Sequence, residues 1–255
     1  MSRSKIALII VAAVIVVVAP IVYIVLFGLQ TADAVEAHWM GQKAPVASRV
    51  PVPLPDTSIS STPHKTISYV GYELELPWDD VDQQTEKAND TIYITRFLSG
   101  SLFRFSVFGP KSFVNELTKD YKIDPDTFRK AYGDMATESD YGFYSRMLAV
   151  TPDSIGPFMR EQDDSRNLVL LVIKVIATPH CESGIFEIRS GELRGFQFDG
   201  AGSKSKLFVD DLYGDDGGIE IWFGQYPNSS TPDITQPEIN RVLQSIHKLP
   251  SPPAR

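Results

Sequence analysis

Cysteine is almost missing from this chain: Cys181 is the single cysteine among 255 residues. One cysteine cannot form an intramolecular disulfide, and it excludes a zinc site built from several thiolates. Basic residues are also scarce, with 24 Lys and Arg against 32 Asp and Glu and a net charge of -8. This balance argues against a nucleic-acid partner, because neutralising phosphates requires a basic surface.

The chain also lacks the short motifs that mark common catalytic and cofactor sites. It contains no G-x-S-x-G nucleophile elbow, no phosphate-binding loop, no dinucleotide fingerprint and no H-E-x-x-H metal motif. We therefore predict no cofactor.

A long apolar run near the start is the strongest positive signal. Residues Ile6–Phe27 include no charged residue and are mostly Ile, Val, Leu and Ala. A bilayer core of ~30 Å requires roughly 20 helical residues to cross it. The sequence therefore predicts a transmembrane helix over residues 6–28, behind a short cytoplasmic leader of residues 1–5.

The charges that flank this run predict its orientation. Arg3 and Lys5 precede it, whereas Asp33 and Glu36 follow it. Because Lys and Arg favour the cytoplasmic side, we expect a single-pass protein of the cell membrane with a cytoplasmic N-terminus and an extracytoplasmic bulk, periplasmic or extracellular. A cleaved signal peptide is the alternative, with Ala32-Asp33-Ala34 as the cleavage-like tripeptide, although signal peptides usually have an apolar core of only ~7–15 residues. Both interpretations export the remainder.

A proline-rich segment follows the apolar run. Between residues 29 and 66 the sequence shows no sustained helical or strand period, and Pro51, Pro53 and Pro55 alternate along it. Such spacing favours an extended spacer, so we predict a tether that holds the next domain away from the membrane. Residues 250–255 form a second short, proline-containing tail.

Residues 67–249 have the alternation of antiparallel strands with one face in water. Apolar residues at every second position predict strands at 72–76, 91–97, 102–108, 186–189, 196–198, 207–209 and 219–223. Ser190-Gly191-Glu192 and Asp215-Asp216-Gly217-Gly218 are typical of hairpin turns, because Gly and Asp accept positive φ.

Helical spacing predicts the elements that cover the apolar face of this sheet. We expect helices at 111–121, 125–132 and 139–150, and for 167–177 the period leaves helix and strand open. Thr235-Gln236-Pro237-Glu238 is a capping box that opens a final helix with an apolar stripe of Ile239, Val242, Leu243, Ile246 and Leu249. We place His247 in its last turn. The predicted class is α+β, with an antiparallel sheet of about six or seven strands packed by helices.

The start of this domain resembles PsbP-like domains. Gly71-Tyr72-Glu73-Leu74-Glu75-Leu76-Pro77-Trp78 is similar to their Gly-aromatic…Pro-x-x-Trp opening strand, although here Trp78 follows Pro77 directly. The order of strand pair, inserted helices, late strands and closing helix is also similar. The resemblance implies a twisted antiparallel sheet sandwiched by helices, in a family of mostly accessory or binding proteins. It transfers no functional residue.

Few residues are candidates for chemistry. His180 and Cys181 are the weak catalytic candidates, but neighbouring residues in an extended chain point to opposite faces. Asp210, Asp211, Asp215 and Asp216 are weak candidates for calcium ligands, although a turn rich in Asp and Gly explains them without metal. The smaller cluster of Asp79, Asp80 and Asp82 has the same two interpretations.

Aromatic residues give the better binding signal. Trp222 falls on the polar face of its strand, and we place Phe208 and the nearby Tyr213 on the polar face as well. A large apolar group on a solvated face indicates either an interaction surface or a covering element. We therefore take these three residues as the candidate binding site.

These patterns lead to one main hypothesis and two alternatives. The main one is a membrane-anchored protein that presents a non-enzymatic binding or accessory domain outside the cytoplasm, to a partner such as an envelope protein. The alternatives are an extracytoplasmic enzyme such as a hydrolase, which would use His180, Cys181 or the acidic turn, and a module that binds a small ligand or metal at Trp222 and Asp215/Asp216.

Overall fold

A computed structural model describes most of the chain after residue 31. The described residues are 32–62, 65–82, 86–87, 90–111, 115, 119, 124, 126, 132, 139–156, 162–179, 181–191, 193–200, 208–214, 217–225 and 232–250. Two compact units divide the chain. Unit 1 comprises residues 1–48 and 150–177, and unit 2 comprises residues 49–149 and 178–255.

Several predicted elements lie outside the described residues. These are the leader, the transmembrane helix at 6–28, most of the helices predicted at 111–121 and 125–132, and the tail after residue 250. Over the ranges given above, no helix combines the length and the apolar character that a membrane crossing needs.

Unit 1 is built from helices. Residues 32–43 form a helix, followed by the 3-10 turn η1 (Pro45–Ser48), the 3-10 turn η3 (Pro152–Ser154) and α5 (Gln162–Ala177). The segment at 167–177, for which helix and strand were both open, is therefore helical.

A buried lysine joins the parts of unit 1. Lys174 is 0% exposed on α5, and its Nζ donates to the carbonyl oxygens of Val150, at 2.7 Å, and Ala47, at 3.4 Å. A buried ammonium is tolerated only when it is hydrogen-bonded. Lys174 thus connects α5 to Val150, which lies just before η3, and to Ala47, which lies in η1.

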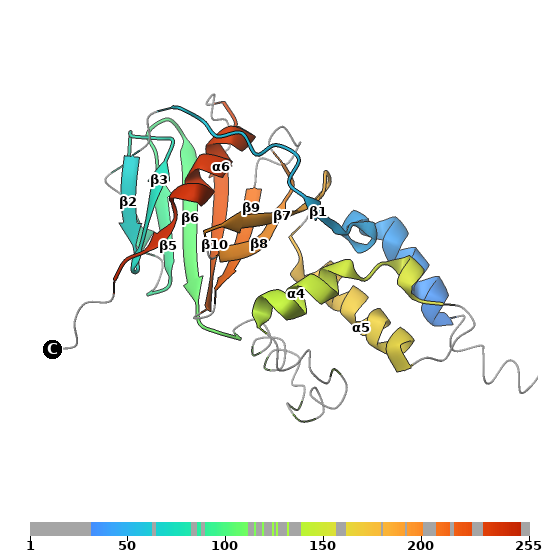
Figure 1. Ribbon diagram of the computed structural model, residues 1–255. Helices are drawn as coiled ribbons and strands as arrows, with labels where there is room; N and C mark the ends of the chain where they lie inside the picture. The colour runs from blue at the N-terminus through green and yellow to red at the C-terminus, as the bar shows by residue number, and fades with distance from the viewer. Residues whose placement is uncertain are drawn as a thin grey trace, which may run out of the picture. The chain divides into compact units, whose positions relative to one another are not determined.

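The centre of unit 2 is an eight-stranded sheet in the order β1-β7-β8-β9-β10-β6-β5-β4 (Figure 1). Its strands are β1 (Pro51–Pro53), β4 (Glu86–Lys87), β5 (Ile92–Arg96), β6 (Ser101–Phe108), β7 (Ile185–Ser190), β8 (Leu193–Phe198), β9 (Phe208–Gly214) and β10 (Gly217–Gln225). Neighbouring strands are antiparallel except β1, which pairs parallel with β7.

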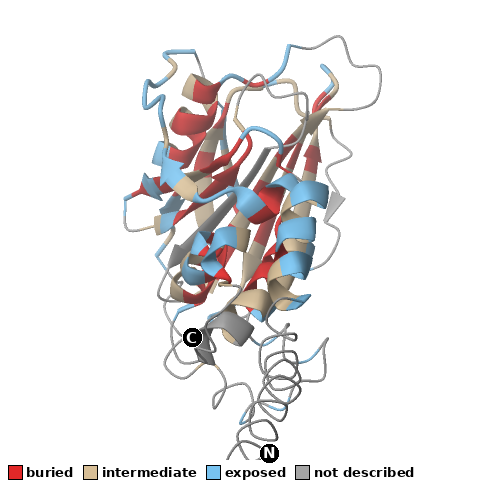
Figure 2. Cartoon of the chain, turned by 90° about the vertical axis from the view of Figure 1, so that its right-hand side faces the viewer, coloured by how far each residue is buried: buried red, intermediate tan, exposed pale blue. Residues whose placement is uncertain are grey.

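One face of this sheet holds the main core. It is covered by α6 (Gln236–Ser245) and by a second sheet, in the order β11-β3-β2, of β2 (Lys65–Tyr69), β3 (Tyr72–Leu76) and β11 (His247–Lys248). Alternate residues of the strands enter this core, among them Phe103, Phe105, Ile221 and Phe223, each at most 1% exposed. Figure 2 shows buried residues along the strands and exposed ones on the loops and outer helix surfaces.

The opposite face is covered over β8 by α4 (Asp140–Ala149). Tyr141 of α4 stacks on Phe196 with ring centroids 5.3 Å apart, and Tyr144 contacts Phe198 at 6.2 Å. Gln197, between these two phenylalanines, is 0% exposed and faces α6. Helices bury both faces of β8. Its residues from Gly195 to Phe198 are therefore all buried, whereas a strand with one face in water alternates between buried and exposed residues.

The α+β class is confirmed, and so are the hairpin turns and the helix at 139–150. The structure has more strands than the six or seven predicted. Strands β1 and β4 are too short to show a period of two, and three strands form a separate sheet. The capping box is confirmed: the backbone N–H and the hydroxyl of Thr235 both donate to Glu238 Oε2 at 2.8 Å.

The position of His247 was predicted wrongly. The helix α6 ends at Ser245, and His247 lies in β11, paired with Glu73 of β3. Its Nε2 is 3.0 Å from Glu73 Oε1. The apolar stripe continues to Leu249, but the helix ends about one turn earlier because the chain after Ser245 pairs with the edge of β3.

The tether predicted at residues 29–66 was wrong over much of its length: residues 32–43 form a helix and Pro45–Ser48 a 3-10 turn, and the next segment belongs to the sheet. Pro51–Pro53 forms β1, so residues 51–53 are a strand of the sheet instead of a free spacer. A proline has no N–H to donate, and strands that contain it are therefore found at sheet edges. β1 occupies that position.

Candidate functional site

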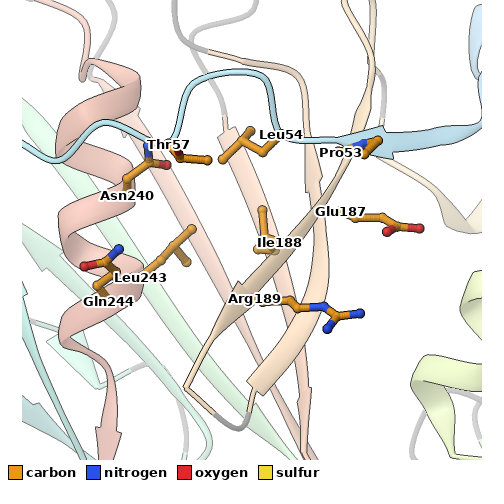
Figure 3. A pocket seen from close by; sticks show the side chains of 9 residues that line it. All are labelled: Pro53, Leu54, Thr57, Glu187, Ile188, Arg189, Asn240, Leu243 and Gln244. Atoms are coloured by element: carbon orange, nitrogen blue, oxygen red, sulfur yellow. The ribbon is translucent and has the colours of Figure 1, made fainter.

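A cavity of about 330 Å³ lies between α6, β7 and the chain that leaves β1 (Figure 3). We call it the α6–β7 cavity. It is lined by Pro53, Leu54, Thr57, Glu187, Ile188, Arg189, Asn240, Leu243 and Gln244. Its volume is at the lower end of the range of small-molecule sites, about 300–1,000 Å³.

Apolar side chains meet in this cavity from three directions. Figure 3 shows Ile188 of β7 and Leu243 of α6 pointing toward one another, with Leu54 beside them. Ile188 and Leu243 are 4% and 3% exposed. An uncharged apolar group would find its best contacts between these side chains.

The two titratable residues that line the cavity, Glu187 and Arg189, have side chains that point away from its interior. In Figure 3 the side chains of Glu187 and Arg189 extend to the side of β7 away from α6. Both residues are exposed, as expected for positions that alternate with the buried Ile188. Neither carboxylate nor guanidinium is therefore placed for acid–base chemistry inside the cavity.

The orientation of α6 is fixed by polar contacts with β3. Arg241 Nη2 and Nε each lie 2.7 Å from Glu75 Oε2. The N–H of Glu75 donates to Ser245 Oγ at 2.8 Å. These contacts hold the side of α6 that carries Asn240 and Leu243 toward β7.

The roof of the cavity is residues 54–60, which we call the docked segment. The side-chain amide of Asn240 donates to the carbonyl oxygens of Asp56 and Ser58, both at 2.8 Å. The N–H of Ser60 donates to the carbonyl oxygen of Pro237 at 2.9 Å. Three hydrogen bonds therefore hold this segment along α6.

A local turn prepares the docked segment for these bonds. The hydroxyl and the N–H of Ser58 donate to Asp56 Oδ1 at 2.6 and 2.9 Å. The Ser58 hydroxyl, and then its N–H, lower the pKa of the Asp56 carboxyl from its ordinary value of 3.8. The ionised Asp56 thus favours a turn of the kind that Asp and Ser often form.

Three amide side chains connect α6 to β8 beneath the roof. Gln197 and Gln236 exchange hydrogen bonds at 2.8 and 2.9 Å, and Gln236 also donates to Asn240 Oδ1 at 3.0 Å. Gln197 donates in addition to the carbonyl oxygen of Asp199 at 3.0 Å. We call Gln197, Gln236 and Asn240 the amide cluster. Its mutual bonds satisfy the amide groups, which would be costly to bury unpaired.

The edge of β7 becomes open at the cavity. The pairing of β1 with β7 ends at Pro53 and Glu187, after which the docked segment turns toward α6. Residues 188–190 therefore have no strand on their outer side within the part of the chain that the structure describes. An open edge offers backbone groups to an incoming extended chain.

Trp222 lies on the sheet face opposite the core, between the buried Ile221 and Phe223. The guanidinium carbon of Arg104 is 4.6 Å from the centroid of its ring, and Arg104 Nη2 is 3.6 Å from Glu220 Oε1. Trp222 Nε1 is buried and has no hydrogen-bond partner among the described residues. Arg104 thus covers part of the Trp222 ring, which the sequence predicted to be a binding surface.

The other two aromatic candidates are described through their pairing. Phe208 is opposite Phe223 in the register of β9 and β10, and Tyr213 is opposite Gly218. The register therefore does not align either of them with Trp222, which is opposite Val209.

The acidic candidates do not assemble into a site among the described residues. Asp210 and Asp211 are strand residues of β9, whereas Asp215 and Asp216 lie outside the described residues. Asp80 lies before β4, and its Oδ2 accepts a hydrogen bond at 2.5 Å from the N–H of Ser99 in the β5–β6 turn. No group of three or more His, Cys, Asp or Glu side chains in the described ranges is placed to hold a metal ion.

Only one of the two catalytic candidates falls within the described residues. Cys181 is 1% exposed, and His180 lies outside those residues. Near Cys181, Ser183 donates to Asp199 Oδ1 from its N–H at 2.6 Å and from its hydroxyl at 2.8 Å. These bonds join the segment before β7, which contains Cys181, to the residue that follows β8.

The sequence did not identify the cavity residues as a site, although Pro53 and Leu243 were named for other reasons. Gln236, Asn240 and Gln244 recur at every fourth position beside the apolar stripe of α6, so they form one row on the helix. This row of amide side chains is the sequence feature that could have indicated a polar contact on this side of α6. The partner segments, residues 53–57 and 187–189, are too distant in sequence for any pattern to pair them with it.

No family model matches this chain, and neither a curated protein nor a solved structure matches it. The PsbP-like resemblance of residues 71–78 therefore stays a prediction.

Proposed function

We propose that this chain is a single-pass membrane protein that presents a non-enzymatic binding domain, unit 2, on the extracytoplasmic side. The domain binds at the α6–β7 cavity, and its guest is an uncharged, partly apolar part of a partner protein, such as an extended peptide segment. The PsbP-like resemblance, from a family of mostly accessory or binding proteins, agrees with this proposal.

One observation carries the binding part of the proposal. The cavity has apolar walls at Leu54, Ile188 and Leu243, while the charged side chains of Glu187 and Arg189 point away from it. A catalytic pocket needs a titratable or nucleophilic group within reach of its guest. Apolar walls beside an open strand edge instead suit an extended chain, which gains backbone hydrogen bonds and side-chain burial together.

The membrane part rests on the amino-acid sequence. The uncharged run Ile6–Phe27 has the length that a bilayer requires, and Arg3 and Lys5 precede it. We expect protease added to spheroplasts to digest unit 2, and the product to stay in the membrane after alkaline extraction. A protected unit 2, or a product that dissolves in the cytosol, contradicts this orientation.

Photocrosslinking tests the cavity. A photoreactive amino acid at the exposed Gln244 should capture a partner in membranes, and Thr57→Trp, which fills the entrance, should abolish the adduct. Ile59→Trp is the matched control, because Ile59 is 44% exposed on the same segment and does not line the cavity. Equal adducts from both Trp variants would contradict binding at this place.

A further inference from the structure

Several large hydrophobic side chains of unit 1 are exposed. Nine large hydrophobic residues are strongly exposed among the described residues, and four of them belong to unit 1: Val35, Trp39, Val169 and Ile176. Val35, Trp39 and Ile176 are 63%, 56% and 60% exposed. Scattered exposed hydrophobic residues are ordinary, but an exposed tryptophan next to an exposed valine on one helix indicates an interaction surface.

Val35 and Trp39 lie on one side of the helix at 32–43. They are four residues apart, so their side chains are neighbours on the helix surface. Ala37, which is 0% exposed, marks the packed side of this helix, and its position is roughly 160–200° around the axis from both residues. The helix therefore buries one side within unit 1 and leaves the Val35–Trp39 face uncovered.

The position of this helix in the chain identifies what covers the face. Only residues 28–31 separate the apolar run Ile6–Phe27 from the helical residues 32–43. Five residue steps, fully extended, reach about 18 Å. If the apolar run crosses a bilayer, as proposed above, the helix cannot leave the neighbourhood of the lipid headgroups.

We propose that the Val35–Trp39 face lies in the interface of the bilayer that holds the preceding segment. Tryptophan is enriched at this depth, because its ring is largely apolar and its N–H can bond to headgroups. The proposal depends on the membrane anchor of the proposed function. It places unit 1 at the membrane surface, and it gives the helix the role of an interfacial anchor next to the span.

The charges of the helix restrict the kind of contact. Asp33 and Glu36 are acidic and Lys43 is basic, so the helix has no cationic surface for anionic lipids. The contact must come from apolar burial and from the indole ring. It should therefore be as strong on phosphatidylcholine as on phosphatidylglycerol, and salt should not weaken it.

Lipid quenching of tryptophan fluorescence tests this placement in the full chain. The protein is reconstituted in phosphatidylcholine vesicles that contain lipids brominated on the acyl chains near the carbonyl. We expect these lipids to quench the intact chain and Trp39→Phe to lose most of the quenched intensity. Trp78 contacts Phe97 in the core and Trp222 lies beneath Arg104, so both should be quenched little.

A pair of substitutions supplies the control. Val35→Asp should reduce the quenching of Trp39, because it places a charge beside the ring at the interface. Val50→Asp should not, since Val50 is similarly apolar and 43% exposed but lies outside this helix. Equal quenching in the intact chain and Trp39→Phe overturns the proposal.

The outcomes separate this inference from the membrane anchor. If the chain does not float with vesicles after alkaline extraction, the anchor fails and this inference fails with it. If the chain floats but Trp39 is shielded from brominated lipid, the anchor stands and the inference is overturned. Shielding from both brominated lipid and aqueous iodide would show that protein, either a second copy or a partner, covers the face.

Discussion

Asn240 and Asp56 are 184 positions apart in the sequence, yet the side-chain amide of Asn240 donates to the carbonyl oxygen of Asp56 at 2.8 Å. The same amide donates to Ser58 and accepts from Gln236. The side chain of Asn240 thus connects the docked segment to the other residues of the amide cluster.

Replacing Asn240 by Leu should loosen the docked segment. The substitution keeps the number and branching of the side-chain heavy atoms but leaves the carbonyl oxygens of Asp56 and Ser58 without their donor, at a cost of about 1–3 kcal/mol in the free energy of unfolding. Limited proteolysis should then cut residues 54–60 sooner. Gln244→Leu, on the exposed next turn, should change neither stability nor cleavage, and equal effects of both substitutions would show that the amide of Asn240 is not responsible.

The hairpin glycines should differ in their tolerance of a side chain. Gly217 has φ +128°, and a Cβ there would be 2.2 Å from the carbonyl oxygen of Phe108. Gly191 has φ +59°, and a Cβ there would have nothing within 4 Å. Gly191→Ala should cost about 1–2 kcal/mol from backbone strain, whereas Gly217→Ala must also displace β6 and should destabilise the fold more. Chemical denaturation of the two variants provides the comparison, and a smaller loss for Gly217→Ala would contradict the packing around β10.

Tyr69 should make stability fall at alkaline pH. Burial raises the pKa of its phenol to about 12 from 10.0, and the hydrogen bond with Thr95 acts in the opposite direction. Since the folded pKa is raised, this contribution to stability is fully present below pH 10 and is lost as the pH rises to 12. In Tyr69→Phe, the slope of the unfolding free energy over this window should be shallower by up to about 1.4 kcal/mol per pH unit. Tyr72→Phe keeps Tyr69 and should retain the steeper slope. An unchanged slope in Tyr69→Phe would assign the alkaline loss to another group.

Lys174 should be essential to unit 1. Lys174→Ala leaves a cavity, which costs about 2–5 kcal/mol when large core side chains are truncated, and it removes the donor that binds the carbonyl oxygens of Val150 and Ala47. Hydrogen exchange of the α5 amides should accelerate strongly. Ile176→Ala, on the same helix at a 60% exposed position, should leave the exchange rates nearly unchanged. Similar exchange in both variants would mean that Lys174 does not hold the unit together.

Local patterns predicted much of the fold. The alternation of β3, β6 and β10 places Leu74, Phe103 and Ile221 in the core, and the capping box at Thr235 begins α6. Turn chemistry marked both hairpins, because Gly191 and Gly217 adopt positive φ. These features depend on neighbours in sequence, which a pattern can detect.

Contacts between distant segments could not be predicted in this way. β1 is three residues long, with prolines at both ends, and pairs with a strand more than 130 residues later. Nothing within Pro51–Pro53 indicates that partner, so the segment resembled a spacer. His247 illustrates the same limit, because its pairing with Glu73 overrode a helical stripe that continued past it. The α6–β7 cavity combines several such distant contacts, which explains why its residues escaped the sequence patterns.

The prolines of β1 also affect how copies of the protein behave when crowded. Pro51 and Pro53 have no N–H, so the outermost strand on this side of the sheet carries a single backbone donor, at Val52. Another molecule's strand therefore finds almost nothing to pair with along β1. If unit 2 is confined to a membrane surface, as we propose, this border would disfavour strand-to-strand association between neighbouring copies.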